Sequence, residues 1–192
     1  MQASRMGVRA VLAILALGGA VASGGTVEDL EKGVLAHPTS DQPTWELAKA
    51  YRESGDAQRA VQFFARFHEA NKPNSQSLVW QGSFKASLAS KAVDMETRMN
   101  LLQSGISDMD RAVRLFGDDV LTRTVRGITL SRFPGFLQMS GRAIDDLEAS
   151  LRQPQALSPA LQVTVREGLA QAYRQAGRTA EADAMLKSAS AR

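Results

Sequence analysis

The sequence predicts an all-α fold in which helical hairpins stack side by side. Apolar residues recur at helical spacing along most of the chain, and glycine or proline separates the segments. A nine-residue segment occurs twice, as LAKAYRESG at 47–55 and as LAQAYRQAG at 169–177, identical at six positions. We therefore expect one leading helix and about four antiparallel hairpins, with one lengthened central helix.

The first 22 residues are typical of a secretory signal peptide. Arg5 and Arg9 precede an acid-free apolar run at 10–22, which ends Ala-Val-Ala. An uncleaved membrane anchor is the alternative, but this run has 13 residues, whereas a helix needs about 20 to cross a bilayer. We expect cleavage after Ala22 and a single helical-repeat domain at 23–192, soluble in the periplasm without a stable membrane anchor.

Composition excludes several functional classes. The whole chain has 23 Lys+Arg and 20 Asp+Glu, so removal of Arg5 and Arg9 leaves 21 against 20, a net charge of +1. Nucleic acid is therefore not an expected partner, because phosphate binding needs a clustered basic face. The chain has no cysteine, which rules out disulfides, thiolate chemistry and a thioether-linked lipid.

The helices before residue 72 follow from their end signals. Thr26 and Asp29 form a loose capping box for a short helix that stops before Pro38. The next helix contains the first copy of the duplicated segment and stops at Gly55, where a left-handed residue ends a helix well. Its partner helix lies within 56–73, with apolar residues at helical spacing.

The middle of the chain predicts a longer helix between two shorter ones. An apolar stripe at spacings of three and four spans about six turns, formed by Met95, Met99, Leu102, Ile106, Met109, Val113 and Phe116. Gly82 and Gly127 occupy positions where neighbouring helices approach closely. Two loops interrupt the later helices, RFPGF at 132–136 and QPQALSP at 153–159.

The duplicated segments resemble the tetratricopeptide repeat, in which a Leu-Gly-x-x-Tyr helix precedes an Ala-x-x-x-Phe helix. Ala replaces the usual glycine after Leu in both copies. The matching positions are Leu47, Ala48, Tyr51, Gly55, Ala60 and Phe64, and again Leu169, Ala170, Tyr173, Gly177, Ala182 and Leu186. The resemblance implies a curved stack whose first helices line a concave binding face, and a non-catalytic adaptor that binds a protein partner in an envelope assembly.

The same register predicts the residues on this concave face. The polar rims supply the candidates for partner binding: Trp45, Glu46, Lys49, Arg52, Glu167, Gln171 and Arg174. The family's carboxylate clamp pairs Lys with Asn on the first inner helix. Those places here hold Trp45 and Lys49, so the pattern does not indicate a chaperone-tail clamp.

The centre of the predicted face is apolar, and two interpretations stay open. An apolar stripe at helical spacing is usually core; alternatively, it lines a cavity for an apolar molecule, with methionines as an adaptable wall. The candidate lining is Val79, Trp80, Met99, Leu121, Val125, Ile128, Phe133, Phe136 and Met139. Chain size, the signal and RGITLSRFPGF…AIDDLE are similar to periplasmic helical-repeat components of bacterial sterol transport, which implies a sterol- or hopanoid-like lipid.

No catalytic or metal-binding constellation is recognisable, and we expect neither an enzyme nor a cofactor. His37 and His68 have no metal-ligand spacing. Asp108 and Asp110 sit two positions apart on a helix and point about 200° apart, so they cannot share one ion. Asp119 is instead expected to cap the helix that follows it.

Overall fold

The computed structural model describes residues 25–72 and 74–190. The expected signal peptide lies outside them. Over the described residues the chain forms nine α-helices and two short 3₁₀ turns, with no strand. The helices are α1 (Val27–Ala36), α2 (Asp41–Ser54), α3 (Ala57–Ala70), α4 (Ser75–Lys91), α5 (Met95–Leu115), α6 (Val120–Ser131), α7 (Ser140–Leu151), α8 (Pro159–Gln175) and α9 (Thr179–Ser190), with 3₁₀ turns η2 (Gly135–Leu137) and η3 (Pro154–Ala156).

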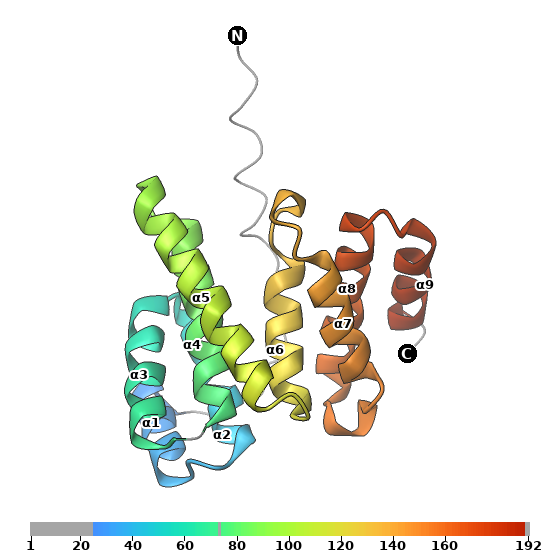
Figure 1. The fold of residues 1–192 in the computed structure, drawn as a ribbon. Coiled ribbons are helices and arrows are strands. Elements are labelled where there is room, and N and C mark those ends of the chain that lie inside the picture. Colours follow the sequence, from blue (N-terminus) through green and yellow to red (C-terminus); the bar gives the residue numbers. More distant parts are fainter. Residues whose placement is uncertain (1–24, 73, 191–192) are drawn as a thin grey trace.

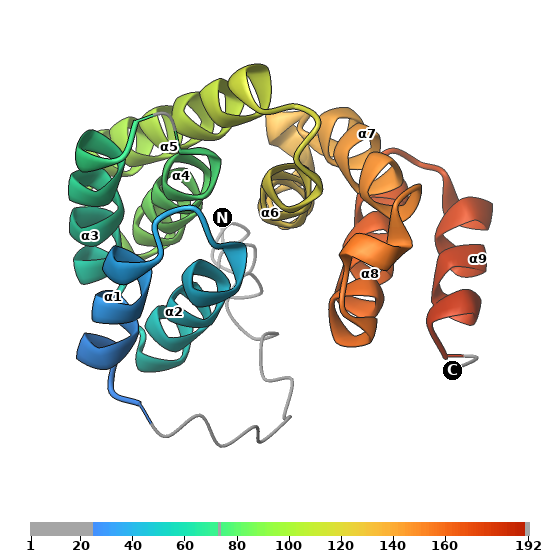
Figure 2. The same cartoon turned by 90° about the horizontal axis from the view of Figure 1, so that it is seen from below.

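The helices form the predicted leading helix and four hairpins, α2–α3, α4–α5, α6–α7 and α8–α9. The hairpins follow one another along an arc, which is seen end-on in Figure 2. Helices α2, α4, α6 and α8 lie on the inner side of this arc, and α3, α5, α7 and α9 lie on the outer side (Figures 1 and 2). The predicted all-α stack is therefore confirmed. We call the inner side, formed by α2, α4, α6 and α8, the concave face.

The helix ends follow the sequence signals. The Thr26 side chain accepts from the Asp29 backbone N–H, and Asp29 accepts from the Thr26 N–H, which completes the capping box. Asp119 caps α6 by accepting from the Leu121 backbone N–H at 3.0 Å. Gly55 and Gly177 end α2 and α8 with φ of 73° and 76°, a conformation that favours glycine. These signals set the hairpin turns where the duplicated segments end.

The two tyrosines of the duplicated segments occupy equivalent places in the stack. Tyr51 of α2 is fully buried, and its hydroxyl donates to Glu31 on α1. Tyr173 of α8 is also buried, and its hydroxyl donates to Glu148 on α7 at 2.7 Å. Each tyrosine thus joins its helix to the helix just before it in the chain. The duplication repeats a tertiary contact.

Helix α5 is the predicted long helix, but its apolar stripe is covered only in part. Met109 is fully buried against α4, where Gly82 and Gly105 let the two helices meet backbone to backbone. Met95 and Met99, in the first turns, are 65% and 49% exposed. The reason is geometric, since the start of α5 projects beyond α3 and diverges from α6 (Figures 1 and 2).

A buried carboxylate holds the middle of the stack together. Asp146 of α7 is fully buried and accepts two hydrogen bonds from Arg126 of α6, at 2.6 and 2.9 Å, and one from Arg123 at 3.1 Å. Arg126 also donates to Asp110 of α5 at 3.1 Å. Beside this network Gly127 leaves room for Leu147 of α7. Hairpins α4–α5 and α6–α7 are therefore joined by paired charges as well as by apolar packing.

Candidate functional site

The concave face is the candidate site because it gathers polar side chains from all four inner helices. At its α2 end, Trp45 is partly exposed and packs edge-on against Trp80 of α4, with ring centroids 5.3 Å apart. Lys49 lies 4.0 Å from Glu53, and Glu46 accepts from Gln42. Both pairs lie within α2, and Trp45 and Lys49 are partly exposed.

Arg52 reaches from α2 onto α4. Its Nη2 donates to Ser83 Oγ at 3.0 Å, and its guanidinium carbon lies 5.0 Å from the centre of the Trp80 ring. Ser83 Oγ in turn lies 2.9 Å from Thr129 Oγ1 of α6. Helices α2, α4 and α6 are therefore linked across the concave face by one line of hydrogen bonds.

Helix α8 is hydrogen-bonded to the end of α6. Gln175 of α8 donates to the backbone carbonyls of Ser131 and Phe133, at 3.1 and 2.8 Å. Arg132 lies between these two carbonyls in sequence, directly after α6, and its side chain is partly buried. Its position follows Thr129 by three residues, about one helical turn, so it extends the same side of α6.

The electrostatics of this line are unusual. Burial lowers the pKa of Arg52, and the nearby charge of Arg132 lowers it further. Burial also lowers the pKa of Arg132, although the charge of Glu167 opposes that shift. No carboxylate of the described residues lies within 4 Å of either guanidinium. The concave face therefore holds two partly desolvated cations without a direct counterion.

At the α8 end the predicted partner-binding residues separate. Glu167 and Gln171 are exposed, and helical spacing places Gln171 on the same side of α8 as Gln175. Arg174 instead extends toward α9, where it lies 3.8 Å from Asp183. The described geometry thus groups Trp45, Glu46, Lys49 and Arg52 at one rim and leaves Arg174 on the flank of the other.

The structure disperses the candidate apolar lining. Five of its members are core residues, two are partly buried, and Met99 and Phe136 are 49% and 81% exposed. Phe133 is buried while Phe136, three residues later, faces outward, so the loop at 132–136 does not hold two rings together. The core members are Val79, Trp80, Val125, Ile128 and Phe133, and the partly buried ones are Leu121 and Met139.

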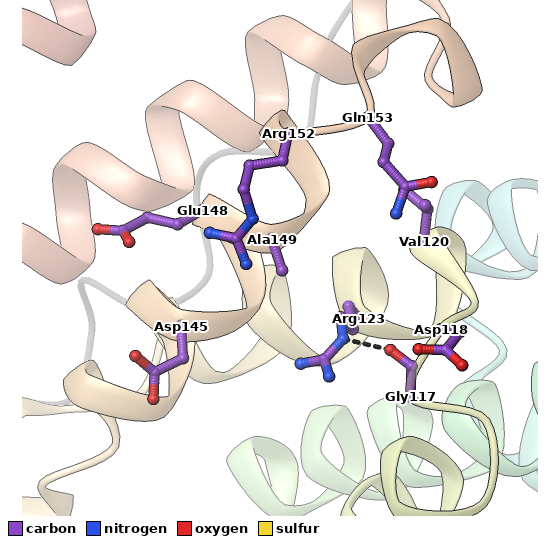
Figure 3. A pocket seen from close by; sticks show the side chains of 9 residues that line it. All are labelled: Gly117, Asp118, Val120, Arg123, Asp145, Glu148, Ala149, Arg152 and Gln153. Atoms are coloured by element: carbon purple, nitrogen blue, oxygen red, sulfur yellow. Dashed lines mark hydrogen bonds between the residues drawn. The ribbon is translucent and has the colours of Figure 1, made fainter.

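Two surface pockets lie elsewhere and contain none of these apolar candidates. The larger, about 440 Å³, is shown in Figure 3. It lies between the start of α6 and the end of α7 and is lined by Gly117, Asp118, Val120, Arg123, Asp145, Glu148, Ala149, Arg152 and Gln153. The smaller, about 200 Å³, is lined by Pro38, Thr39, Ser40, Asn74, Ser75, Gln76 and Phe116.

The larger pocket has charges of both signs, and two of its charged residues, Arg123 and Glu148, have structural partners. Arg123 pairs with Asp146 and donates to the Gly117 carbonyl, while Glu148 accepts from Tyr173. The sequence did not predict this pocket, because its residues come from separate helices and form no recognisable motif. The same is true of Arg132, whose only sequence signal is a cation beside the Phe-Pro-Gly-Phe turn.

The acidic residues considered for metal binding are paired with cations. Asp108 accepts from Lys85 at 2.6 Å, and Asp110 accepts from Arg126 at 3.1 Å. Within the described part of the chain, no three His, Cys, Asp or Glu side chains are grouped as a metal site would require. None of the helices in that part combines the length and the apolar character needed to span a bilayer.

Comparison with known proteins shows the fold. No protein-family model matches the sequence, and no curated protein matches it significantly. Among solved structures, the chain is similar to TTC0263, a thermophilic TPR protein from Thermus thermophilus, with a TM-score of 0.64 and 19% identity over 85% of this chain and 79% of that one. It is also similar to MamA, with a TM-score of 0.51 and 17% identity over 85% and 84% of the two chains. The helical hairpins are thus tetratricopeptide-like in three dimensions.

Proposed function

We propose that the protein is a non-catalytic scaffold that binds a protein partner through its concave face. The observation that carries this proposal is the convergence of α2, α4, α6 and α8 on one face with partly exposed polar and aromatic side chains (Figure 2). Stacked helical hairpins use such curved surfaces to bind extended segments of other proteins. The tetratricopeptide-like fold of the structural neighbours supports the same interaction role.

Site-specific photo-crosslinking in cells tests the scaffold proposal. A crosslinking amino acid at Lys49 or Gln171 samples the concave face, and one at exposed Gln62 of α3 samples the outer side. We expect a discrete adduct of one mass from both inner positions and none from Gln62. Equal adducts from all three positions, or none from the inner pair, would contradict binding through the concave face.

We further propose that the scaffold works in the periplasm as an adaptor in an envelope assembly. The basic, apolar and small-residue regions of residues 1–22 support export. The intact mass of protein recovered from the periplasmic fraction should correspond to a chain that begins at Ser23. Recovery of the full-length mass from the cytoplasm would contradict export.

The alternative of a sterol- or hopanoid-like ligand stays a sequence-based prediction. Neither described pocket is lined by its candidate residues, and five of those residues lie in the core. Native mass spectrometry of gently purified protein checks it. A co-purifying lipid mass would support the alternative, and a clean protein mass without a lipid-induced rise in Tm would argue against it.

A further inference from the structure

Arg52 and Arg132 are held at the concave face, and no carboxylate of the described residues lies within 4 Å of either guanidinium. Of the other partly buried arginines, Arg59, Arg123, Arg126 and Arg142 pair directly with carboxylates of the described residues, whereas Arg98 and Arg166 do not. The polar partner of the Arg52 side chain is the neutral hydroxyl of Ser83. Taking a cation out of water is costly unless an anion compensates it. The two guanidinium groups are therefore available to bind an anion.

A line of hydrogen bonds leads from Arg52 to α6, and Arg132 lies directly after that helix. Arg52 bonds Ser83, Ser83 bonds Thr129, and Thr129 precedes Arg132 by about one helical turn. The positive charge of Arg132 also contributes, after burial, to lowering the pKa of Arg52. Each guanidinium presents several N–H donors, so both cations have donors to offer to an anionic group.

The surroundings favour a peptide carboxylate over a polyanion. Arg52 stacks over Trp80, and the partly exposed Trp45 ring adjoins it, so an apolar side chain has a surface to contact next to the charge. The buried indole N–H of Trp80 has no hydrogen-bond acceptor among the described residues. Glu46 on α2 and Glu167 on α8, whose charge acts on Arg132, would repel a string of phosphates. Guanidinium groups match the planar carboxylate well.

We propose that Arg52 and Arg132 jointly bind the carboxylate of an Asp or Glu in an extended segment of a partner protein, with an apolar residue of that segment against Trp45. The Lys-Asn pattern of the carboxylate clamp has no part in this arrangement, because its two places hold Trp45 and Lys49. This inference rests on the proposed scaffold function and names the chemistry of its partner.

The test begins with random dodecapeptides displayed on phage and selected on the full protein. Enriched peptides are then synthesised, and their affinities are measured by isothermal titration calorimetry. We expect an acidic residue at a fixed position next to an apolar one. Arg52→Gln and Arg132→Gln should each weaken binding roughly tenfold to 100-fold, as expected for a hydrogen bond to a charged group. Arg52→Lys should give an intermediate loss.

A double-mutant cycle tests the direct contact. Replacing the selected Asp or Glu of the peptide by its amide should weaken binding to the wild type, but have little further effect on Arg52→Gln. Arg66→Gln is the matched control, because Arg66 is exposed on the outer helix α3. Arg52→Gln also removes the contact with the Trp80 ring, so the affinities of both Arg→Gln variants are measured well below their Tm.

The outcomes separate this inference from the scaffold proposal. Peptides whose binding depends on Trp45 but not on an acidic residue would overturn the assignment of a carboxylate ligand. They would leave the scaffold proposal standing. A rise in Tm with inorganic phosphate alone, as large as that with peptide and lost in both arginine variants, would also overturn it and indicate a free-anion site. A selection without any enriched peptide would count against both.

Discussion

Gly82 of α4 and Gly105 of α5 cross so closely that a Cβ on Gly82 would lie 2.5 Å from the Gly105 carbonyl oxygen. Real Cβ atoms do not tolerate that distance, so Gly82→Ala must push the two helices apart. We expect it to lower the free energy of unfolding by about 1–3 kcal/mol, measured by urea denaturation with circular dichroism. Gly33→Ala in α1 is the control, because a Cβ there meets nothing within 4 Å. Equal effects of both substitutions would disprove the steric explanation.

Removing the buried carboxylate of Asp146 should be more damaging than removing an exposed one. Asp146→Ala leaves Arg126 and Arg123 without the group that receives three of their hydrogen bonds. Breaking a buried ion pair costs about 3–5 kcal/mol. Asp145→Ala, at the exposed neighbour, should change stability by less than about 0.5 kcal/mol. Similar melting temperatures for the two variants would show that the network does not stabilise the stack.

Acid should weaken the fold before the carboxylates titrate, because His68 is buried between α3 and α4. Burial lowers the pKa of His68, and the positive charges of Arg111 and Lys72 lower it further, against the opposing charge of Glu69. The unfolded chain therefore binds a proton at higher pH than the folded chain. The contribution is fully present above about pH 6.5 and is lost as pH falls from there toward the lower, folded pKa.

The measurement is the free energy of unfolding between pH 7.5 and pH 5. His68→Gln should flatten its decline, whereas His37→Gln, at an exposed site, should leave the slope unchanged. A wild-type stability that is constant over this window would contradict the prediction.

The two tyrosines should resist ionisation while the protein is folded. Burial and the hydrogen bond to Glu148 raise the pKa of Tyr173 to about 12, and burial and Glu31 raise the pKa of Tyr51 further. Unfolded phenols ionise near pH 10, so the folded state binds more protons and its stability falls as pH rises above 10. In an alkaline titration, phenolate absorbance should therefore appear well above pH 10, together with the loss of the helical circular-dichroism signal. Two independent phenols titrating near pH 10 in the folded protein would contradict this.

Local signals made the stack predictable from the sequence. The capping residues Thr26 and Asp119, the glycine at 55 and the duplicated Tyr-containing segments act within a few residues of themselves, so one chain suffices to locate the hairpins. The long helix was predictable for the same reason. Its coverage was not, because Met95 and Met99 satisfy the apolar period although they are 65% and 49% exposed.

The candidate site was harder to predict, since it depends on which helices meet. Val79 and Val125 fit an inner face by register, yet they are buried within the stack. Arg132 was missed because its importance comes from Arg52, 80 positions earlier in the chain. Periodicity identifies the apolar side of a helix but does not say whether another helix, a partner or solvent covers it.

The T-shaped contact between Trp45 and Trp80 gives the protein a built-in optical reporter at one end only. These are the two tryptophans of the chain, and both lie in the first two hairpins, with the guanidinium of Arg52 over one ring. Intrinsic fluorescence will follow α2 and α4, whereas circular dichroism averages over every helix. A difference between the two signals during denaturation would thus reveal whether the N-terminal hairpins open before the rest of the arc.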